Sequence, residues 1–267
     1  LPIEFFRYNF SYGDFNKNLQ IIKDLKFEFP NIKICADLKG PEQRLRFINH
    51  DLKSYELKKD SQLIIYTSKE KAMNHSSTIY FEMGEFIQEN DILLMDDSKI
   101  IARVLKKIED KIVLIFENDC VIDRDTSVSV NYQHFSMAPV DEESFFKIRK
   151  LNEYCDFLMV SFVRNGKEIQ KIRPHFKGKI ISKIETSEGV HNYNDILNES
   201  DMMLIARGDL SMVYTLKQLP VIIDQLSSNF NKKKTYLATN FWESTQVQKA
   251  PSFSNVFDLY HSYKQGI

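Results

Sequence analysis

The sequence has few of the features that mark secreted, membrane-bound or nucleic-acid-binding proteins. Its three cysteines, Cys35, Cys120 and Cys155, are scattered and lack the spacing of a metal site, which predicts reduced thiols in a cytoplasmic protein. No apolar run approaches the ~20 residues of a membrane-spanning helix, and no signal peptide is apparent. The net charge of −1 provides no electrostatic attraction to nucleic acid or to an anionic membrane. We therefore expect a cytoplasmic protein that binds neither nucleic acid nor a membrane.

The sequence does contain enough apolar residues for a large core. Hydrophobic residues occupy 43% of the 267 positions and charged residues 27%, as in a soluble globular protein. This length accommodates one barrel-sized domain or two smaller ones. Because the first residue is Leu1 and not methionine, we expect the natural chain to start upstream.

Two apolar runs end in charged residues. The β-branched run at 179–184 predicts a buried strand, and Lys183 and Glu185 lie two residues apart at its end, so their side chains share one face. The run at 202–205 is followed in the same way by Arg207 and Asp209. Charged residues at the ends of buried strands are typical of the active face of an α/β barrel. The alternative is an ion pair that only caps a strand end.

The order of predicted elements indicates a β domain inserted into an α/β chain. The segments at 2–11 and 31–37 are predicted strands with a helix between them, and both end in polar or charged residues. From about Leu45 to Asn131 short strands alternate with charged turns, among them a hairpin turn at Glu109 and Asp110. The α/β alternation resumes after Pro139. We expect a barrel domain at 1–44 and 138–267, with an inserted β-barrel lid domain at 45–137.

These segments carry motifs that resemble those of the pyruvate kinase family, in the family's order and over nearly all of residues 3–267. The motifs are Arg7-Tyr-Asn9-Phe-Ser11, Asp37-Leu-Lys39-Gly-Pro-Glu42-Gln-Arg44, Met95-Asp96-Asp97, Val160-Ser-Phe-Val-Arg164, Lys183-Ile-Glu185, Ala206-Arg-Gly-Asp-Leu210 and Leu237-Ala-Thr239. The resemblance implies a (β/α)8 TIM-type barrel, here partial, with strands two to seven. The family's first βα unit, its last barrel strand and its C-terminal regulatory domain have no counterpart in this sequence. Because open sheet edges promote aggregation, the missing strands would come from residues outside this sequence, from a partner or from a rearranged fold.

The resemblance also implies a set of site residues for phosphoryl transfer from phosphoenolpyruvate. Lys183 would stabilise the transferring phosphoryl group, with Arg7 and Thr239 as further catalytic residues. Oxygen ligands suit hard cations, and Mg²⁺ or Mn²⁺ would bind Glu185 and Asp209. The implied K⁺ ligands are Asn9, Ser11, Asp37 and the carbonyl of Leu38; the implied substrate-binding residues are Ala206, Arg207, Gly208 and Arg44. Without the resemblance, each of these would be interpreted as an ordinary polar residue at a strand end or in a loop.

Other positions depart from the family pattern. Val128 stands where the family has a lysine for the nucleotide phosphates, and the segment Pro251–Asn255 lacks both charged residues of the family's interface motif. The first pattern predicts a weakened site for ADP or ATP, and the second a homo-oligomer with an altered interface.

Two functional hypotheses follow. The first is a pyruvate-kinase-like phosphotransferase that uses Mg²⁺ and K⁺. The second is a divergent homologue that binds phosphoenolpyruvate, pyruvate or a related oxoacid as a sensor or subunit, or that transfers the phosphoryl group to an acceptor other than ADP. Retention of Lys183 favours a catalytic function, because a protein that only binds the acid has no need of this lysine. The sequence does not identify the phosphoryl acceptor.

Overall fold

The computed structural model describes residues 4–49, 51–74, 79–131, 140–227, 234–239, 241–242, 244–245 and 249–266. The first two residues of the strand predicted at 2–11 therefore lie outside the described part. The chain forms two compact units. The first comprises residues 1–41, 137–207 and 217–267, and the second comprises residues 42–136 and 208–216. The domain boundaries expected from the sequence stay a prediction.

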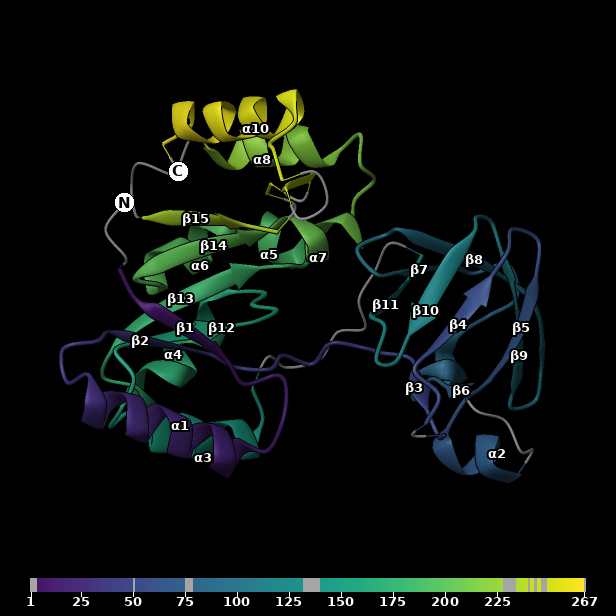
Figure 1. Cartoon of the computed structure of the whole chain (residues 1–267), viewed down its shortest axis with the longest axis horizontal. Helices are drawn as coiled ribbons and strands as arrows, with labels where there is room; N and C mark the ends of the chain where they lie inside the picture. Colours follow the sequence, from purple (N-terminus) through teal and green to yellow (C-terminus); the bar gives the residue numbers. More distant parts are fainter. Residues whose placement is uncertain are drawn as a thin grey trace. The chain divides into compact units, whose positions relative to one another are not determined.

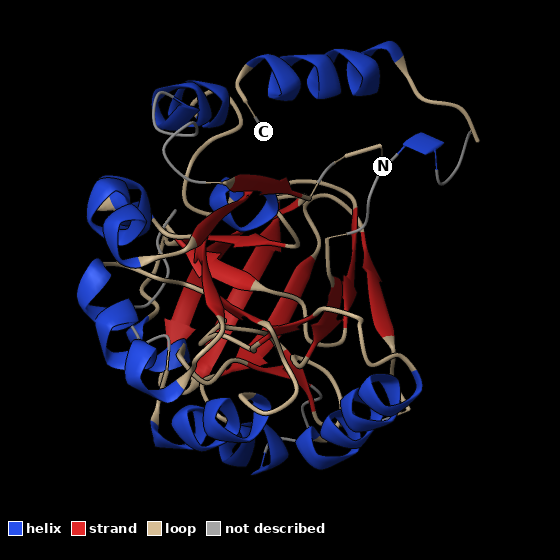
Figure 2. Ribbon diagram, turned by 90° about the vertical axis from the view of Figure 1, so that its left-hand side faces the viewer, coloured by secondary structure: helices blue, strands red, loops and turns tan. Residues whose placement is uncertain are grey.

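The first unit contains a six-stranded, fully parallel sheet with the order β1-β2-β12-β13-β14-β15. Its strands are β1 (Phe6–Asn9), β2 (Ile34–Asp37), β12 (Phe157–Val160), β13 (Lys179–Ile184), β14 (Met202–Ala206) and β15 (Thr235–Ala238). The sheet is curled (Figure 2). The order of its strands in space is the same as their order along the chain. The predicted partial TIM-type barrel with six consecutive strands is confirmed.

Helices lie between the strands of this sheet along the chain, and a further helix follows the last strand (Figure 1). They are α1 (Phe15–Glu28), α3 (Glu142–Leu151), α4 (Gly166–Ile172), α5 (Ser187–His191), α6 (Tyr193–Glu199), α7 (Arg207–Ser211), α8 (Leu219–Ser227) and α10 (Phe253–Lys264). Side chains of Asp14, Asp141 and Asn165 cap the first turns of α1, α3 and α4 by accepting backbone N–H bonds. These three helices therefore begin at start signals that lie in the sequence itself.

Short helices follow β13 and β14. After β13, α5 begins at Ser187 and α6 at Tyr193. The first turn of α5 is capped because the Thr186 hydroxyl accepts a bond from the Gly189 N–H, at 2.9 Å. The short helix α7 follows β14 directly and was not predicted.

The inner side of the curled sheet is filled mainly by apolar side chains. Its buried members are Cys35, Phe157, Met159, Ile181, Met202, Leu204 and Ala206. Phe5 and Tyr236 pack against this cluster, with their rings in an edge contact at 5.8 Å. Alternate residues of neighbouring strands fill the space, so this half-barrel interior is a packed core.

A polar contact links the segment before β1 to the opposite edge strand β15. The Glu4 carboxylate accepts a hydrogen bond of 2.6 Å from the Tyr236 hydroxyl, and it also pairs with the Lys234 ammonium. Glu4 and Tyr236 are 232 residues apart in sequence. The first and last strands of the sheet are thereby tied together at their amino ends.

Residues 42–136 of the second unit consist mainly of β-strands, with a small helix and a 3₁₀ turn between them. Its seven-stranded sheet has the order β11-β7-β8-β9-β5-β6-β3, and β4 and β10 form a separate antiparallel pair. The elements are β3 (Arg46–Phe47), β4 (Ser54–Leu57), β5 (Gln62–Tyr66), α2 (Lys69–Asn74), β6 (Ile79–Tyr80), η1 (Gly84–Phe86), β7 (Ile92–Met95), β8 (Ile100–Ile108), β9 (Lys111–Phe116), β10 (Cys120–Asp123) and β11 (Val128–Val130). The predicted hairpin turn at Glu109 and Asp110 connects β8 and β9. Within the part of the chain that the structure describes, no helix is long and apolar enough to cross a membrane.

The contact between Glu4 and β15 predicts a pH-dependent contribution to stability. The hydrogen bond from Lys234, followed by the bond from Tyr236, lowers the pKa of Glu4 below its ordinary value of 4.5. A carboxyl group whose pKa is lowered by folding stabilises the protein above its unfolded-state pKa, and this stabilisation is lost as the pH falls through the folded-state pKa. We expect Glu4→Gln to lower the free energy of unfolding at about pH 7 and to have a much smaller effect at about pH 3. Urea unfolding of both proteins at both pH values measures this.

The matched control is Glu28→Gln, because Glu28 is exposed at the end of α1 and has no ion pair among the described residues. Equal destabilisation by Glu4→Gln at both pH values would contradict the expected charge dependence.

Candidate functional site

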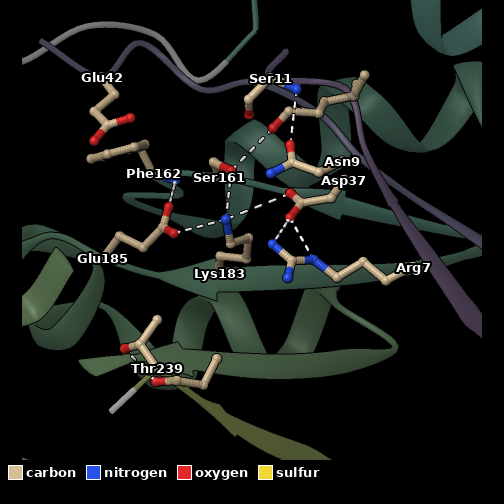
Figure 3. A network of polar contacts seen from close by, with 12 residues as sticks. Arg7, Asn9, Ser11, Asp37, Glu42, Ser161, Phe162, Lys183, Glu185 and Thr239 are labelled. Carbon is tan, nitrogen blue, oxygen red and sulfur yellow. Dashed lines mark hydrogen bonds and ion pairs between the residues drawn. The ribbon is translucent and has the colours of Figure 1, made fainter. Parts of the chain in front are cut away.

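Four charged side chains meet at the carboxyl ends of β1, β2 and β13 (Figure 3). Arg7 lies on β1, Asp37 ends β2, Lys183 lies near the end of β13, and Glu185 follows that strand directly. The Arg7 Nε and Nη2 atoms donate to Asp37 Oδ2 at 2.8 and 2.5 Å. The Lys183 ammonium lies 2.9 Å from Glu185 Oε1 and 3.5 Å from Asp37 Oδ1. The predicted common face of Lys183 and Glu185 is confirmed, and the sheet adds Arg7 and Asp37 to it.

Ser161 is the residue of this network to which the sequence analysis assigned no role. Ser161 follows β12 directly. Its hydroxyl accepts a bond of 3.0 Å from the Lys183 ammonium and donates to the Leu38 carbonyl at 3.1 Å. Ser161 is buried, so this hydroxyl holds Lys183 from the neighbouring strand. The sequence signal was its place in the motif Val160-Ser-Phe-Val-Arg164, which the structure puts at the end of β12.

Glu185 is almost completely buried, with 1% of its surface exposed. Its second carboxylate oxygen, Oε2, accepts a 2.7 Å bond from the Phe162 N–H. Phe162 has a φ of +57°, a left-handed conformation that costs a bulky residue roughly 1–3 kcal/mol. This turn of the backbone directs the N–H toward Glu185, so both oxygens of the buried carboxylate have a donor.

Asp37 has one carboxylate oxygen without a hydrogen bond. Its side chain is 3% exposed, and Oδ1 is a buried atom with no hydrogen-bond partner in the described ranges; the ammonium of Lys183 at 3.5 Å is its nearest charge partner. Asn9 lies opposite Asp37 in the β1–β2 register, and its side-chain oxygen accepts a bond from the Ser11 N–H. These oxygen atoms, together with the Leu38 carbonyl, are the donor type that a hard monovalent cation prefers. The orphaned oxygen of Asp37 fits the implied K⁺ site.

The predicted divalent-metal pair cannot be assembled from one unit. Glu185 belongs to the first unit and Asp209 to the second, so their pairing stays a prediction. In the described part of the chain, no group of three or more His, Cys, Asp or Glu side chains is placed to hold a metal ion. Because the oxygens of Glu185 are engaged by Lys183 and Phe162, a cation at Glu185 would have to displace one of these donors or share a carboxylate oxygen with it.

The side chain of Arg207 has a structural role in the first unit. Its guanidinium pairs with Asp258 of α10 at 2.7 Å, donates to the Thr239 carbonyl at 2.8 Å, and lies 4.1 Å from the ring centre of Phe241. The Thr239 hydroxyl donates to the Ala238 carbonyl at 2.7 Å, and Thr239 lies apart from the Lys183 network (Figure 3). A substrate contact through the backbone at Ala206–Gly208 stays a prediction.

Val128 and Arg44, the two positions that the sequence analysis related to substrate and nucleotide binding, lie in the second unit. Val128 of β11 is 1% exposed and belongs to the core of that unit. The Arg44 guanidinium pairs with Glu42 and donates to the Asp125 carbonyl. Arg44 is therefore held by its own unit, and Val128 offers no polar group to a phosphate.

A curled sheet of six parallel strands with charged residues at its carboxyl ends defines an α/β protein of the TIM-barrel type. The family model described as the barrel domain of pyruvate kinase matches residues 2–266, so the chain belongs to the pyruvate kinase family. It is 26% identical to the pyruvate kinase of Thermotoga maritima over an alignment of 281 positions, which covers 100% of the chain and 59% of that protein. It is 26% identical to the pyruvate kinase of Mycoplasma genitalium, with 97% and 55% covered, and 30% identical to that of Methanocaldococcus jannaschii, with 72% and 41% covered. The chain thus spans little more than half the length of the first two relatives.

The close approach of Gly40 to the turn after β12 generates a prediction about how the site is held. A β-carbon at Gly40 would lie 2.6 Å from Phe162 Cδ2 and 2.7 Å from Ser161 Cβ. Gly40→Ala must therefore displace the two residues that hold Glu185 and Lys183. We expect the free energy of unfolding to fall by about 1–3 kcal/mol, as for other overpacked sites, measured by urea unfolding.

The control is Lys39→Ala, since the neighbouring Lys39 is exposed. Unchanged stability of Gly40→Ala beside an unchanged control would mean that the turn at Ser161 and Phe162 does not pack against Gly40.

Proposed function

We propose that this chain is part of a pyruvate-kinase-like phosphotransferase that acts on phosphoenolpyruvate or pyruvate with Mg²⁺ and K⁺. The observation that carries the proposal is the placement of the Lys183 ammonium among Ser161, Glu185 and Asp37 at the carboxyl end of β13. Barrel enzymes place their reacting groups at this end of the strands. Family membership supports the reaction class, and the residues of the site agree with it.

The charges of the site explain why cations would be needed. Lys183 and Arg7 contribute two positive charges, and Asp37 and Glu185 contribute two carboxylates that are 3% and 1% exposed. A phosphoryl group brought to this site would face the buried carboxylates, and their repulsion has to be offset by added positive charge. Bound Mg²⁺ and K⁺ would supply that charge. Glu185 and Asp209 are the proposed ligands of the first ion; Asn9, Ser11, Asp37 and the Leu38 carbonyl are those of the second.

The side chains of the chain itself have distinct proposed roles. Lys183 donates to the oxygens of the transferring phosphoryl, and Ser161 holds the ammonium in place from the adjacent strand. Arg7, whose side chain is 51% exposed, reaches the phosphate with a planar donor pair suited to phosphate oxygens. Thr239 and the backbone at Ala206–Gly208 bind the substrate carboxylate. Phosphoryl transfer requires positioning and charge stabilisation more than a protein nucleophile, and this set provides both.

A second candidate function is favoured by the surroundings of Val128 and Arg44. Val128 is a core residue of the second unit, and the Arg44 guanidinium is bonded to Glu42 and to the Asp125 carbonyl. This supports a homologue that binds phosphoenolpyruvate or an oxoacid as a sensor or subunit, or that uses an acceptor other than ADP.

Substitution of Lys183 by methionine tests the catalytic proposal. If the ammonium acts mainly on the phosphoryl group in transit, Lys183→Met should lower turnover by about 100- to 1,000-fold, as for the loss of other preorganised stabilising groups. Binding of phosphoenolpyruvate in the presence of Mg²⁺ and K⁺ should be largely retained. Turnover by a coupled assay and affinity by calorimetry measure the two effects separately.

Lys217→Met is the control, because Lys217 is an exposed lysine on the segment before α8. A Lys183→Met variant with wild-type turnover would contradict the proposal. A wild-type protein that binds phosphoenolpyruvate without any turnover would instead support the second candidate.

The valine at position 128 predicts that ADP binds more weakly than phosphoenolpyruvate or an oxoacid. A charge-assisted hydrogen bond contributes about 1.5–3 kcal/mol, so the lysine missing at Val128 should weaken ADP by about ten- to a hundredfold. We expect phosphoenolpyruvate or an oxoacid to bind more tightly than ADP in calorimetric titrations with Mg²⁺ and K⁺. ADP affinity in the micromolar range, with oxoacids no tighter, would overturn this order and favour ordinary pyruvate kinase activity.

A further inference from the structure

A basic hollow lies at the amino ends of the barrel strands, away from the candidate site. It has a volume of about 480 Å³. Its charged lining residues lie directly before or at the start of strands β2, β12, β13 and β14, or on the turn that precedes β13. They are Lys33, Asp156, Arg173, Lys177, Lys179 and Asp201. Because all these strands are parallel, the hollow and the Lys183 network occupy opposite ends of the same sheet.

The two carboxylates of the hollow are already neutralised. Asp156 Oδ2 accepts bonds of 2.9 Å from the Ile34 N–H and from the Lys26 ammonium. Asp201 Oδ2 accepts a 2.8 Å bond from the Ile180 N–H and pairs with Arg173 at 2.8 Å. Each carboxylate thus has one cation and one backbone donor at its Oδ2 atom.

Three lysines of the hollow remain without such a partner. Lys33, Lys177 and Lys179 are exposed, and their ammonium groups make no hydrogen bond or ion pair within the described ranges. Lys179 acts on the Glu4 carboxylate only through a small Coulombic effect, and Glu4 is itself paired with Lys234 and Tyr236. The charged lining residues, four cations and two carboxylates, therefore give the hollow a net charge of +2, and three of its lysines have no carboxylate partner in the described ranges.

The floor of the hollow is apolar and uncharged. Phe157 and Cys155 are 3% and 7% exposed, and burial raises the pKa of the Cys155 thiol to about 12. The thiol therefore adds no negative charge. Gly178 completes the lining; a β-carbon there would lie 2.4 Å from the Asp156 carbonyl oxygen, so no side chain can occupy this position without moving the backbone.

We infer that this hollow binds a small organic anion with two or more phosphate or carboxylate groups. The volume is within the usual range of small-molecule sites, about 300–1,000 Å³. The lysine ammonium groups would each pair with an anionic group of the ligand. The apolar floor would contact the carbon atoms that join these groups. The inference does not depend on the proposed function, because none of the residues of the Lys183 network lines the hollow.

Calorimetric titration with inorganic pyrophosphate, without divalent cations, tests the inference. Four proteins are compared: the wild type, the triple variant Lys33→Gln/Lys177→Gln/Lys179→Gln, a control triple variant Lys17→Gln/Lys106→Gln/Lys217→Gln, and Lys183→Met. The control changes the net charge equally at three exposed lysines elsewhere. Lys183→Met removes the principal cation of the candidate site, so binding there is recognised separately.

We expect the hollow variant to bind pyrophosphate about tenfold more weakly or worse, and the control and Lys183→Met to bind like the wild type. Acetate, with a single charge, should bind far more weakly than pyrophosphate to the wild type. Equal affinities of the hollow variant and the wild type would overturn the inference, as would equal losses in both triple variants or no binding by the wild type. A loss only in Lys183→Met would place pyrophosphate at the candidate site and would also overturn it.

Discussion

The parallel register of the six-stranded sheet is the constraint on which the candidate site depends. Asn9 pairs with Asp37, and Val160 pairs with Ser182, so Arg7, Asp37, Ser161 and Lys183 come to one edge from successive strands. A shift of one residue in any of these strands would turn its side chains to the opposite face. The burial of Cys35, Phe157 and Ile181 on the inner face opposes such a shift, since it would expose apolar surface. The packing of the core and the geometry of the site are therefore fixed by the same hydrogen bonds.

Two buried carboxylates make this site costly to build. An unpaired charge in the interior destabilises a protein by several kcal/mol, and here Arg7, Lys183 and the Phe162 N–H offset that cost. The left-handed backbone of Phe162 and the tight contact at Gly40 are part of this arrangement. Strained backbone of this kind is concentrated at functional sites.

The two ends of the sheet differ in their chemistry. At the carboxyl ends, two positive and two negative side chains balance, with the carboxylates of Asp37 and Glu185 buried and Arg7 half exposed. At the amino ends, three exposed lysines outnumber the acidic groups available to them, which suits an anion that arrives alone. Strand β13 carries a lysine at each end, Lys179 in the hollow and Lys183 in the candidate site.

The sequence by itself determined the six barrel strands, their order and the chemical character of the strand ends. The β-branched run at 179–184 predicted β13 with its observed bounds, and period-two geometry placed Lys183 and Glu185 on one face. Only the tertiary structure decided which groups hold them: Ser161 comes from another strand, and Arg207 binds Asp258, 51 residues away. It also decided that one oxygen of Asp37 is left without a hydrogen bond and that three lysines share a hollow. The physical reason is that periodicity records which way each residue points along its own strand. Contacts between strands depend on register and packing, which no local pattern contains.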